Sequence, residues 1–229
     1  MIDKRYQRNI PSLSEEECAL LAEKRVCVIG CGGLGGYVLE HLARIGVGHI
    51  TAVDGDVFDE SNLNRQILSS EALIGTPKAD AAARHIGEIN SMIQVHPVNC
   101  FLTEENAEEL IMGHDLVIDA LDSPAARIIL SAACTKQRIT MIHGAVSGWN
   151  GQVAVVRPGS RLMENLYHNT EPDQSPSTLS FTPAIAASIE VAEAVKVLCG
   201  KPTQLDSNML FFDLLTGDFN LFDITGLQN

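Results

Sequence analysis

A glycine-rich segment near the amino terminus has the residue types and spacing that bind phosphate. The string Val26-Cys-Val-Ile-Gly30-Cys-Gly32-Gly33-Leu-Gly35 follows a β-rich run and matches the pattern G-x-G-x-x-G. In this pattern the first glycine permits a tight turn, the second lets the backbone approach a phosphate, and the last lets a helix pack on a strand. The N–H groups at the start of that helix attract an anion.

An acidic residue follows at the spacing typical of a ribose ligand. Asp54 comes nineteen residues after Gly35, at the end of the next β-rich run. A carboxylate there can accept hydrogen bonds from ribose hydroxyls. The two features together predict nucleotide binding. The glycines alone would suit a dinucleotide, and therefore a dehydrogenase.

The polar residues after Asp54 favour a nucleoside triphosphate instead. The two bridging phosphates of a dinucleotide sit on the glycine loop without cationic side chains, whereas departing pyrophosphate needs neutralisation. Arg65 offers a planar fork for phosphate and Lys78 a compact charge. Asn62 and Gln66 can add neutral hydrogen bonds.

One further carboxylate is a candidate metal ligand. Asp122 follows the β-rich run Asp115–Ala120, so it lies at the carboxyl edge of a parallel sheet, where ligands of such folds bind. A hard oxygen ligand there suits Mg²⁺ shared with phosphate. Alternatively, Asp122 only caps the helix that begins at Pro124. We expect Asp56 to be structural or to support the site, and His143 to be a hydrogen-bonded structural residue.

The elements that position these residues alternate between strand and helix from residue 25 to about 145. This rhythm predicts an α/β fold with a doubly wound, mainly parallel, Rossmann-like sheet and helices on both faces. The expected strands are Arg25–Ile29, His49–Asp54, Gln94–Asn99, Asp115–Ala120 and Thr140–Ala145. The expected helices are Leu34–Ile45, Lys78–Asn90, Thr103–Met112 with Thr103 as N-cap, and Pro124–Lys136.

The flanking segments complete a single domain with an arm at 1–24, a nucleotide-binding core at 25–145 and a C-terminal extension at 146–229. In the arm, Ser14 and Glu17 form a capping box for a helix ending at Glu23. The extension is expected to be antiparallel. Its expected parts are the strand Trp149–Val156, a loop over Pro158–Thr182, the helix Pro183–Leu198, and a hairpin of Met209–Asp213 with Asn220–Ile224.

Composition narrows the class of partner. Apolar residues make up 45% of the 229-residue chain, and the formal net charge is −13 without a basic run, which disfavours nucleic acid. No apolar stretch reaches the roughly 18 residues of a membrane span. The polar amino terminus does not read as a signal peptide, so we expect a cytoplasmic protein.

Taken together, these motifs resemble the ThiF/MoeB/HesA family, the bacterial relatives of ubiquitin-activating enzymes. The strings that carry the resemblance are G-x-G-G-L-G, D-x-D, S-N-L-x-R-Q, G-x-P-K and D-x-x-D-S. Arg5–Ile10 is similar to the family's R-Y-x-R-Q-I start, and Gly144–Val153 to its strand-and-crossover segment. The resemblance runs from Arg5 to about Lys201.

The resemblance implies an adenylyltransferase that uses Mg²⁺ and ATP. It would activate the C-terminal Gly-Gly carboxylate of a small ubiquitin-like sulfur carrier protein, ThiS-like or MoaD-like, as an acyl-adenylate with release of pyrophosphate. Asp54 would hold the ribose and Asp122 the Mg²⁺. The expected phosphate contacts are Asn62, Arg65, Gln66 and Lys78. Arg8 would reach the phosphates of the neighbouring subunit, because the family works as a homodimer.

Two departures from the family pattern change the expectations. Many members hold a structural zinc with two C-x-x-C pairs, but this chain has Met163–Leu166 in the first place, so no structural zinc is expected. Some relatives use a cysteine on the crossover loop, and Pro158–Thr182 has none. Because Cys134 and Cys199 are expected to be buried, we expect adenylation without a covalent thioester.

Three alternatives stay open at this point. The first is a related enzyme that acts on a modified adenosine of tRNA, since that branch shares the N-R-Q and D-x-x-D-S strings. The second is a nicotinamide-dependent dehydrogenase, which Arg65 and Lys78 argue against. The third is a non-enzymatic scaffold that binds a nucleotide and a partner. The pathway, whether thiamine, molybdopterin or another, does not follow from the residues.

Overall fold

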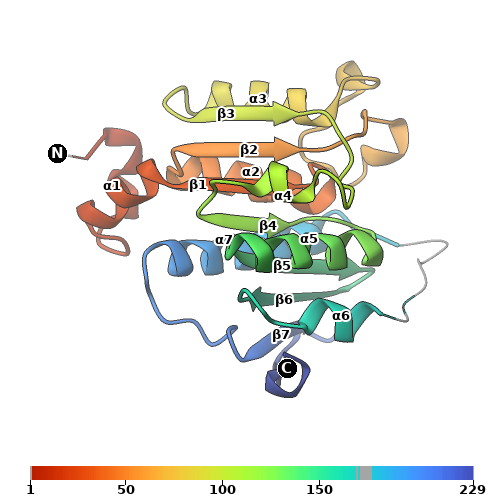
Figure 1. Ribbon diagram of the computed structural model, residues 1–229. Coiled ribbons are helices and arrows are strands. Elements are labelled where there is room, and N and C mark those ends of the chain that lie inside the picture. Colours follow the sequence, from red (N-terminus) through yellow and green to blue (C-terminus); the bar gives the residue numbers. More distant parts are fainter. Residues whose placement is uncertain (1, 169, 171–176, 229) are drawn as a thin grey trace.

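One eight-stranded sheet forms the centre of the molecule, with strand order β3-β2-β1-β4-β5-β6-β7-β8 (Figure 1). The computed structural model describes residues 2–168, 170 and 177–228. Strands β1 to β5 run parallel, and β6, β7 and β8 are antiparallel to their neighbours. The strands are β1 Arg25–Ile29, β2 His49–Val53, β3 Gln94–Val98, β4 Leu116–Asp119, β5 Thr140–Ser147, β6 Asn150–Val156, β7 Asn208–Asp213 and β8 Asp218–Asp223. The predicted fold class is confirmed.

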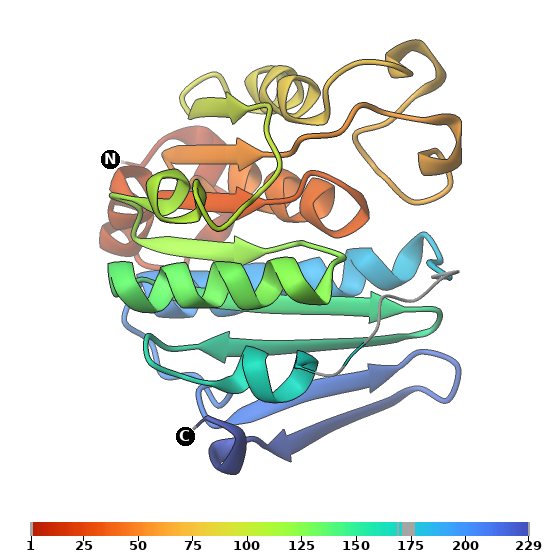
Figure 2. The ribbon, with the colours of Figure 1, turned by 45° about the vertical axis from the view of Figure 1, so that its right-hand side comes forward.

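Helices cover both faces of this sheet. Helices α2, α3 and α7 pack on one face, and α4, α5 and α6 on the other (Figures 1 and 2). The helices are α1 Glu15–Glu23, α2 Gly33–Ile45, α3 Lys78–Ile89, α4 Ala107–Ile111, α5 Pro124–Gln137, α6 Leu162–Tyr167 and α7 Phe181–Leu198. Short 3₁₀ turns are η1 Lys4–Asn9, η2 Glu60–Asn62, η3 Glu71–Leu73 and η4 Thr225–Leu227. Each face therefore has its own apolar core.

The strand order places a crevice where chemistry can occur. Strand β1 pairs with β2 on one side and with β4 on the other, so the connections leave β1 and β4 in opposite directions. In open parallel sheets such a switch point opens a crevice at the carboxyl ends of the strands. The glycine loop, Asp54 and Asp122 all follow strands that end at this edge.

Local signals in the sequence account for several helix ends. The capping box at α1 is confirmed, since Glu17 N donates to Ser14 Oγ at 3.2 Å and Ser14 N donates to Glu17 Oε2 at 2.9 Å. Pro124 stands in the first turn of α5, where its missing N–H costs nothing. Gly46 ends α2 in the left-handed conformation, with φ 99°.

Two predicted elements differ from the structure. Helix α4 begins at Ala107 with Asn106 at its N-cap position, so the predicted start at Thr103 is four residues early. Residues 104–106 form turns before the regular helix, although Ala107 N already donates to Thr103 O at 3.1 Å. The predicted loop Pro158–Thr182 contains helix α6. That helix forms because Leu162 and Met163 are fully buried in the core beside α5. Residues 169 and 171–176 of the predicted loop lie outside the described residues.

Among the helices that the structure describes, none is both long and apolar enough to cross a membrane.

Candidate active site

The glycine loop joins β1 to α2 in a conformation that only glycine allows. Gly30 has φ +101°, and a Cβ atom there would lie 2.6 Å from the carbonyl oxygen of Ala120. A Cβ at Gly35 would lie 1.8 Å from Gly30 O, which confirms the close packing of helix on strand. At Gly32 a Cβ would meet only the Gln66 amide at 3.5 Å, so this part of the loop faces open space.

Asp54 is fixed by backbone donors on both sides of its carboxylate. Cys31 N in the glycine loop donates to Oδ2 at 2.7 Å, and Asp56 N donates to Oδ1 at 2.8 Å. An ionised carboxylate has about four acceptor positions. Both oxygens therefore keep capacity for hydroxyl donors from a ligand.

Two cationic side chains face the loop from the segment after β2. Lys78, at the first position of α3, is almost completely buried, and its Nζ lies 3.1 Å from Asp56 Oδ2. The Arg65 Nη1 donates to Ser61 O at 2.9 Å and to Asn64 Oδ1 at 2.8 Å, while its Cγ lies beside Gly33. These contacts hold both charges in place beside the N-terminal end of α2.

Asp122 is exposed to the cavity rather than used as a helix cap. Ser123 caps α5 instead, since its Oγ accepts from Ala126 N at 3.4 Å. Among the described residues no group of three His, Cys, Asp or Glu side chains gathers as a metal site. A Mg²⁺ on Asp122 fits this donor set, because Mg²⁺ takes one or two carboxylates and completes its shell with phosphate oxygens and water.

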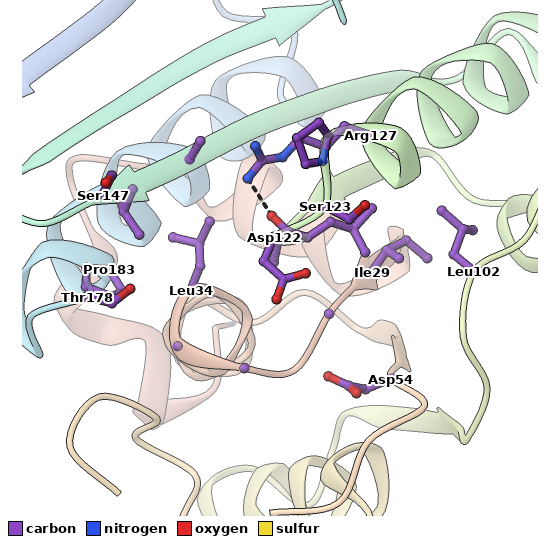
Figure 3. Close-up of a pocket in the computed structure, with 18 of the residues that line it drawn as sticks. Ile29, Leu34, Asp54, Leu102, Asp122, Ser123, Arg127, Ser147, Thr178 and Pro183 are labelled. Atoms are coloured by element: carbon purple, nitrogen blue, oxygen red, sulfur yellow. Dashed lines mark hydrogen bonds between the residues drawn. The ribbon is translucent and has the colours of Figure 1, made fainter. Parts of the chain in front are cut away.

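A cavity of about 720 Å³ unites most of the predicted site residues. Figure 3 shows Asp122 at its centre, with Asp54 on one side and Thr178 and Pro183 on the other. Eight of the residues predicted from sequence line it: Gly30, Gly32, Gly33, Asp54, Arg65, Gln66, Lys78 and Asp122. Asp56 lines it as well.

Three predicted site residues lie outside the lining. Gly35 is packed beneath the loop. Asn62 closes the capping box of η2, because its Oδ1 accepts from the backbone N of the N-cap residue Asp59 at 3.1 Å. Arg8 lies in η1, which packs through Tyr6 against Gly46 at the far end of the 13-residue helix α2. That helix is about 20 Å long, so Arg8 does not reach the cavity of its own chain.

A buried polar network centred on His143 lies behind one wall of the cavity, and its members Gln152 and Tyr167 line that wall. His143 Nδ1 lies 2.7 Å from Asp119 Oδ2, and its Nε2 lies 3.1 Å from the Tyr167 hydroxyl and 3.2 Å from Gln152 Nε2. Burial lowers the pKa of His143 and so favours the neutral ring, although Asp119 opposes the shift. His143 thus has hydrogen-bonded partners, as expected for a structural residue.

Arg127 extends this network to the cavity lining. Its Nη2 donates to Leu121 O at 2.6 Å, its Nε lies 3.7 Å from Asp119 Oδ2, and its guanidinium lies 5.0 Å from the Tyr167 ring centre (Figure 3). Arg127 comes from the second turn of α5, five residues after Asp122. The D-x-x-D-S string stops short of it, so no motif signalled it.

The cysteines have the environment of apolar side chains. Cys18, Cys27, Cys31 and Cys134 are buried, while Cys100 and Cys199 are half-buried. Burial raises the pKa of Cys134 to about 12, and it also raises that of Cys199. Neither thiol is activated as a nucleophile. Cys199 is more exposed than expected, because it follows the last residue of α7.

The fold and the cavity define an α/β protein with a glycine loop at the switch point of its sheet and two cationic side chains beside that loop. The sequence profile of the ThiF family matches residues 6–229, so the chain belongs to the ThiF family. It is 33% identical over 223 residues to the SAMP-activating enzyme E1 of Haloferax volcanii, covering 94% of this chain and 83% of that protein. It is 32% identical to the molybdopterin-synthase adenylyltransferase of Escherichia coli, covering 87% and 82%. It spans 50% of the longer adenylyltransferase and sulfurtransferase MOCS3 of Arabidopsis thaliana.

Solved structures share the fold. The structure of E. coli MccB with ATP has a TM-score of 0.84 at 21% identity, over 100% of this chain and 73% of that one. The E. coli tRNA N6-threonylcarbamoyladenosine dehydratase TcdA has a TM-score of 0.73 at 24% identity, over 86% and 94%. At these identities the likeness concerns the fold alone.

Proposed function

We propose that the chain is an ATP-dependent adenylyltransferase that activates the C-terminal glycine carboxylate of a small ubiquitin-like sulfur carrier protein. The product would be an acyl-adenylate, formed with release of pyrophosphate. The relatives support this class, because two of them are named as adenylyltransferases and one as a SAMP-activating E1. The MoaD-like or ThiS-like identity of the carrier is part of the proposal.

The observation that carries the proposal is the composition of the cavity. The glycine loop lines one continuous space together with four charged side chains. These are the carboxylates of Asp54 and Asp122 and the cationic groups of Arg65 and Lys78. The same space continues to Ser147, Gln152 and Thr178 on the other side of Asp122. A dehydrogenase has no need of the cations, and a pure scaffold has no need of the Asp122 carboxylate. The two sides suit two substrates that meet beside Asp122.

The nucleotide side would be held by backbone and side chains already in position. The amides at the start of α2 would bind phosphate, and Asp54 would accept from the ribose hydroxyls. Arg65 and Lys78 would neutralise the charge that develops as pyrophosphate departs. Lys78 would exchange Asp56 for a phosphate, and Gln66, whose buried Oε1 has no partner, would orient its amide across the loop.

Asp122 would hold Mg²⁺ against the phosphates. When bound, the ion would polarise the phosphate oxygens and orient the leaving group. The chain itself would supply position: the carboxylate tail would enter between the β5–β6 turn and Thr178 and lie facing the α-phosphate. Arg127 on the cavity wall would attract its negative charge. No protein nucleophile is needed, because the tail carboxylate is the nucleophile.

An ATP–pyrophosphate exchange assay tests this function. Exchange of labelled pyrophosphate into ATP should require both Mg²⁺ and a carrier protein with a free Gly-Gly terminus. The matched control is the same carrier without its last glycine, which should support no exchange. If tRNA instead of a carrier protein stimulated the exchange, the enzyme would belong to the tRNA-modifying class. Tight binding of NAD without binding of ATP would indicate a dehydrogenase.

A further inference from the structure

One large aromatic side chain is exposed in the cavity and has no role in the chemistry described so far. Phe101 is 63% exposed, the highest value among the phenylalanines of the described residues, and yet it lines the cavity together with Cys100 and Leu102. Contact between an apolar ring and water is unfavourable. A ligand that covered the ring at the rim of this polar site would therefore gain binding free energy.

The ring is held in place rather than left free. Asn106 Nδ2 donates to Phe101 O at 2.8 Å, and Asn106 Oδ1 accepts from Thr103 N at 2.8 Å, so the turn that carries the ring is closed by one side chain. The ring also packs on Gly55, where an added Cβ would lie 2.6 Å from its carbons. One face is therefore buried against the backbone after Asp54, and the other is accessible.

The direction of a bound nucleotide brings its base to this ring. Phosphates on the glycine loop and a ribose on Asp54 define a line that runs from β1 past the end of β2 towards β3. Phe101 follows β3, and Asp54 N donates to Val98 O at 3.1 Å, so the two strand ends lie together. Figure 3 shows Ile29 and Leu102 on this side of the cavity, opposite Thr178 and Pro183. The base would thus enter an apolar corner.

We propose that Phe101 stacks on the base of the bound nucleotide and sets its affinity. This inference rests on the proposed function, since it takes ATP as the ligand. Stacking on a ring face does not read the hydrogen-bonding edge of a base. Phe101 therefore provides affinity that is tolerant of base identity, and it contributes nothing to the binding of the phosphates.

The test compares ATP with inorganic tripolyphosphate, which has the charge of ATP without its base. In calorimetric titrations with Mg²⁺, Phe101→Ala should weaken ATP binding about tenfold, within the range of aromatic stacking measured by alanine substitution. The same variant should bind tripolyphosphate as tightly as the wild type. Phe101→Trp should retain the ATP affinity of the wild type. Phe101→Leu should show most of the decrease in ATP affinity expected for Phe101→Ala, because leucine has no aromatic face.

Phe219→Ala is the matched control, because Phe219 is 53% exposed and lies outside the cavity lining on β8. It should leave both affinities unchanged. An unchanged ATP affinity in Phe101→Ala would overturn the inference alone. Equal losses for ATP and tripolyphosphate would overturn it too, because the ring would then shape the loop. Wild-type protein that binds no ATP would overturn the proposed function and this inference with it.

Discussion

At the scale of single residues, the three carboxylates that line the cavity differ in their protein partners. Asp54 accepts from two backbone N–H groups, and Asp56 pairs with Lys78. Asp122 makes no hydrogen bond or ion pair with the described residues, and its neighbour Ser123 caps α5. A carboxylate left unpaired beside a phosphate site is the one available to a metal ion.

Replacing Asp122 by alanine should therefore stop catalysis without unfolding the protein. We expect pyrophosphate exchange to fall by at least about 100-fold, since Mg²⁺ loses its protein ligand in a step that depends on electrostatic stabilisation. Thermal unfolding should change little because the side chain is exposed. Asp218→Asn, an exposed carboxylate on β8, is the control for charge. Wild-type turnover with an ordinary Mg²⁺ requirement in Asp122→Ala would refute the role.

The residues found from sequence and those missed differ in what fixes their positions. Gly30, Asp54 and Asp122 follow strand ends, and strand ends of a parallel sheet converge whatever the rest of the chain does. Arg127 reaches the cavity because α5 packs on β4 and β5, a contact that no local pattern encodes. Phe101 depends on a turn closed by the Asn106 side chain. The positions of Arg127 and Phe101 therefore depend on tertiary packing and on side-chain hydrogen bonds.

At the scale of elements, the contact between α2 and β1 depends on the absence of a side chain at Gly35. A methyl group would overlap Gly30 O, a backbone atom that cannot rotate away. Gly35→Ala should lower the free energy of unfolding by about 3 kcal/mol or more, because overpacking forces the backbone to shift. Urea unfolding measures this loss.

The control for this prediction is a second helical glycine. Gly87 lies in α3, is exposed, and would meet no atom within 4 Å of an added Cβ. Gly87→Ala should stabilise the protein by about 0.5 to 1 kcal/mol, since alanine loses less backbone entropy in a helix. If both substitutions changed stability alike, the close approach at Gly35 would not be its cause.

Helix α7 places a carboxyl group inside the protein without a partner. Glu190 is fully buried against Gly144, and neither of its carboxyl oxygens has a hydrogen-bond partner within the described structure. Burial, reinforced by the negative charge of Asp119, raises the pKa of Glu190 well above its ordinary value, although Arg127 opposes the shift. Glu190 is therefore protonated in the folded protein at pH values where the unfolded chain has already ionised it.

This difference makes stability depend on pH with a definite sign. Unfolded glutamate ionises near about pH 4.3. Above that pH the native state binds more protons than the unfolded chain, so the free energy of unfolding falls as pH rises towards the native pKa, by up to about 1.4 kcal/mol per pH unit from this group. Glu190→Gln removes this contribution.

Urea unfolding of both proteins from pH 5 to pH 8 measures the effect, with exposed Glu88→Gln on α3 as a control for the loss of one charge. The stability of Glu190→Gln relative to wild type should rise with pH. A constant difference across this range would show that Glu190 is already ionised in the folded state.

Most elements could be predicted, and the exceptions have local causes. Strands β1 to β5 and helices α2, α3 and α5 follow apolar runs of the right period, and each was predicted within a residue or two of its observed bounds. Helix α6 was missed because its packing on α5 and η4, and not a local sequence pattern, stabilises six residues inside a polar, proline-containing segment. The predicted start of α4 was four residues early, because residues 104–106 form turns before the regular helix begins at Ala107.

At the scale of the whole molecule, the position of Arg8 bears on whether a single chain can form the complete active site. The arm that carries it is fastened at the amino edge of the sheet, where Asn90 Nδ2 donates to the Tyr6 hydroxyl at 2.6 Å. Figure 1 shows the amino terminus at the opposite end from the arrowheads of β1 and β2. The residues that follow these two strands line the cavity. Arg8 is exposed in the single chain. If it acts on the triphosphate, a second copy must bring it there.

Subunit complementation tests this homodimer prediction. Arg8→Ala and Lys78→Ala should each be inactive, since each removes one cation from every site. In a mixed dimer, one site would contain both defects, and the other would combine the intact Lys78 of one chain with the intact Arg8 of its partner. Random exchange makes about half of the dimers mixed, so about a quarter of the wild-type exchange activity per site should return.

The control mixture is Lys78→Ala with Asp122→Ala, two changes in the cavity of the same chain. In its mixed dimers each site keeps one defect, so activity should not return, even though the subunits exchange equally well. Native mass measurements establish that mixed dimers have formed. If they are present and the Arg8→Ala mixture stays inactive, Arg8 does not act across the interface. Full activity of Arg8→Ala on its own would instead show that the arm is a solvated terminus, as its exposure in the single chain would allow.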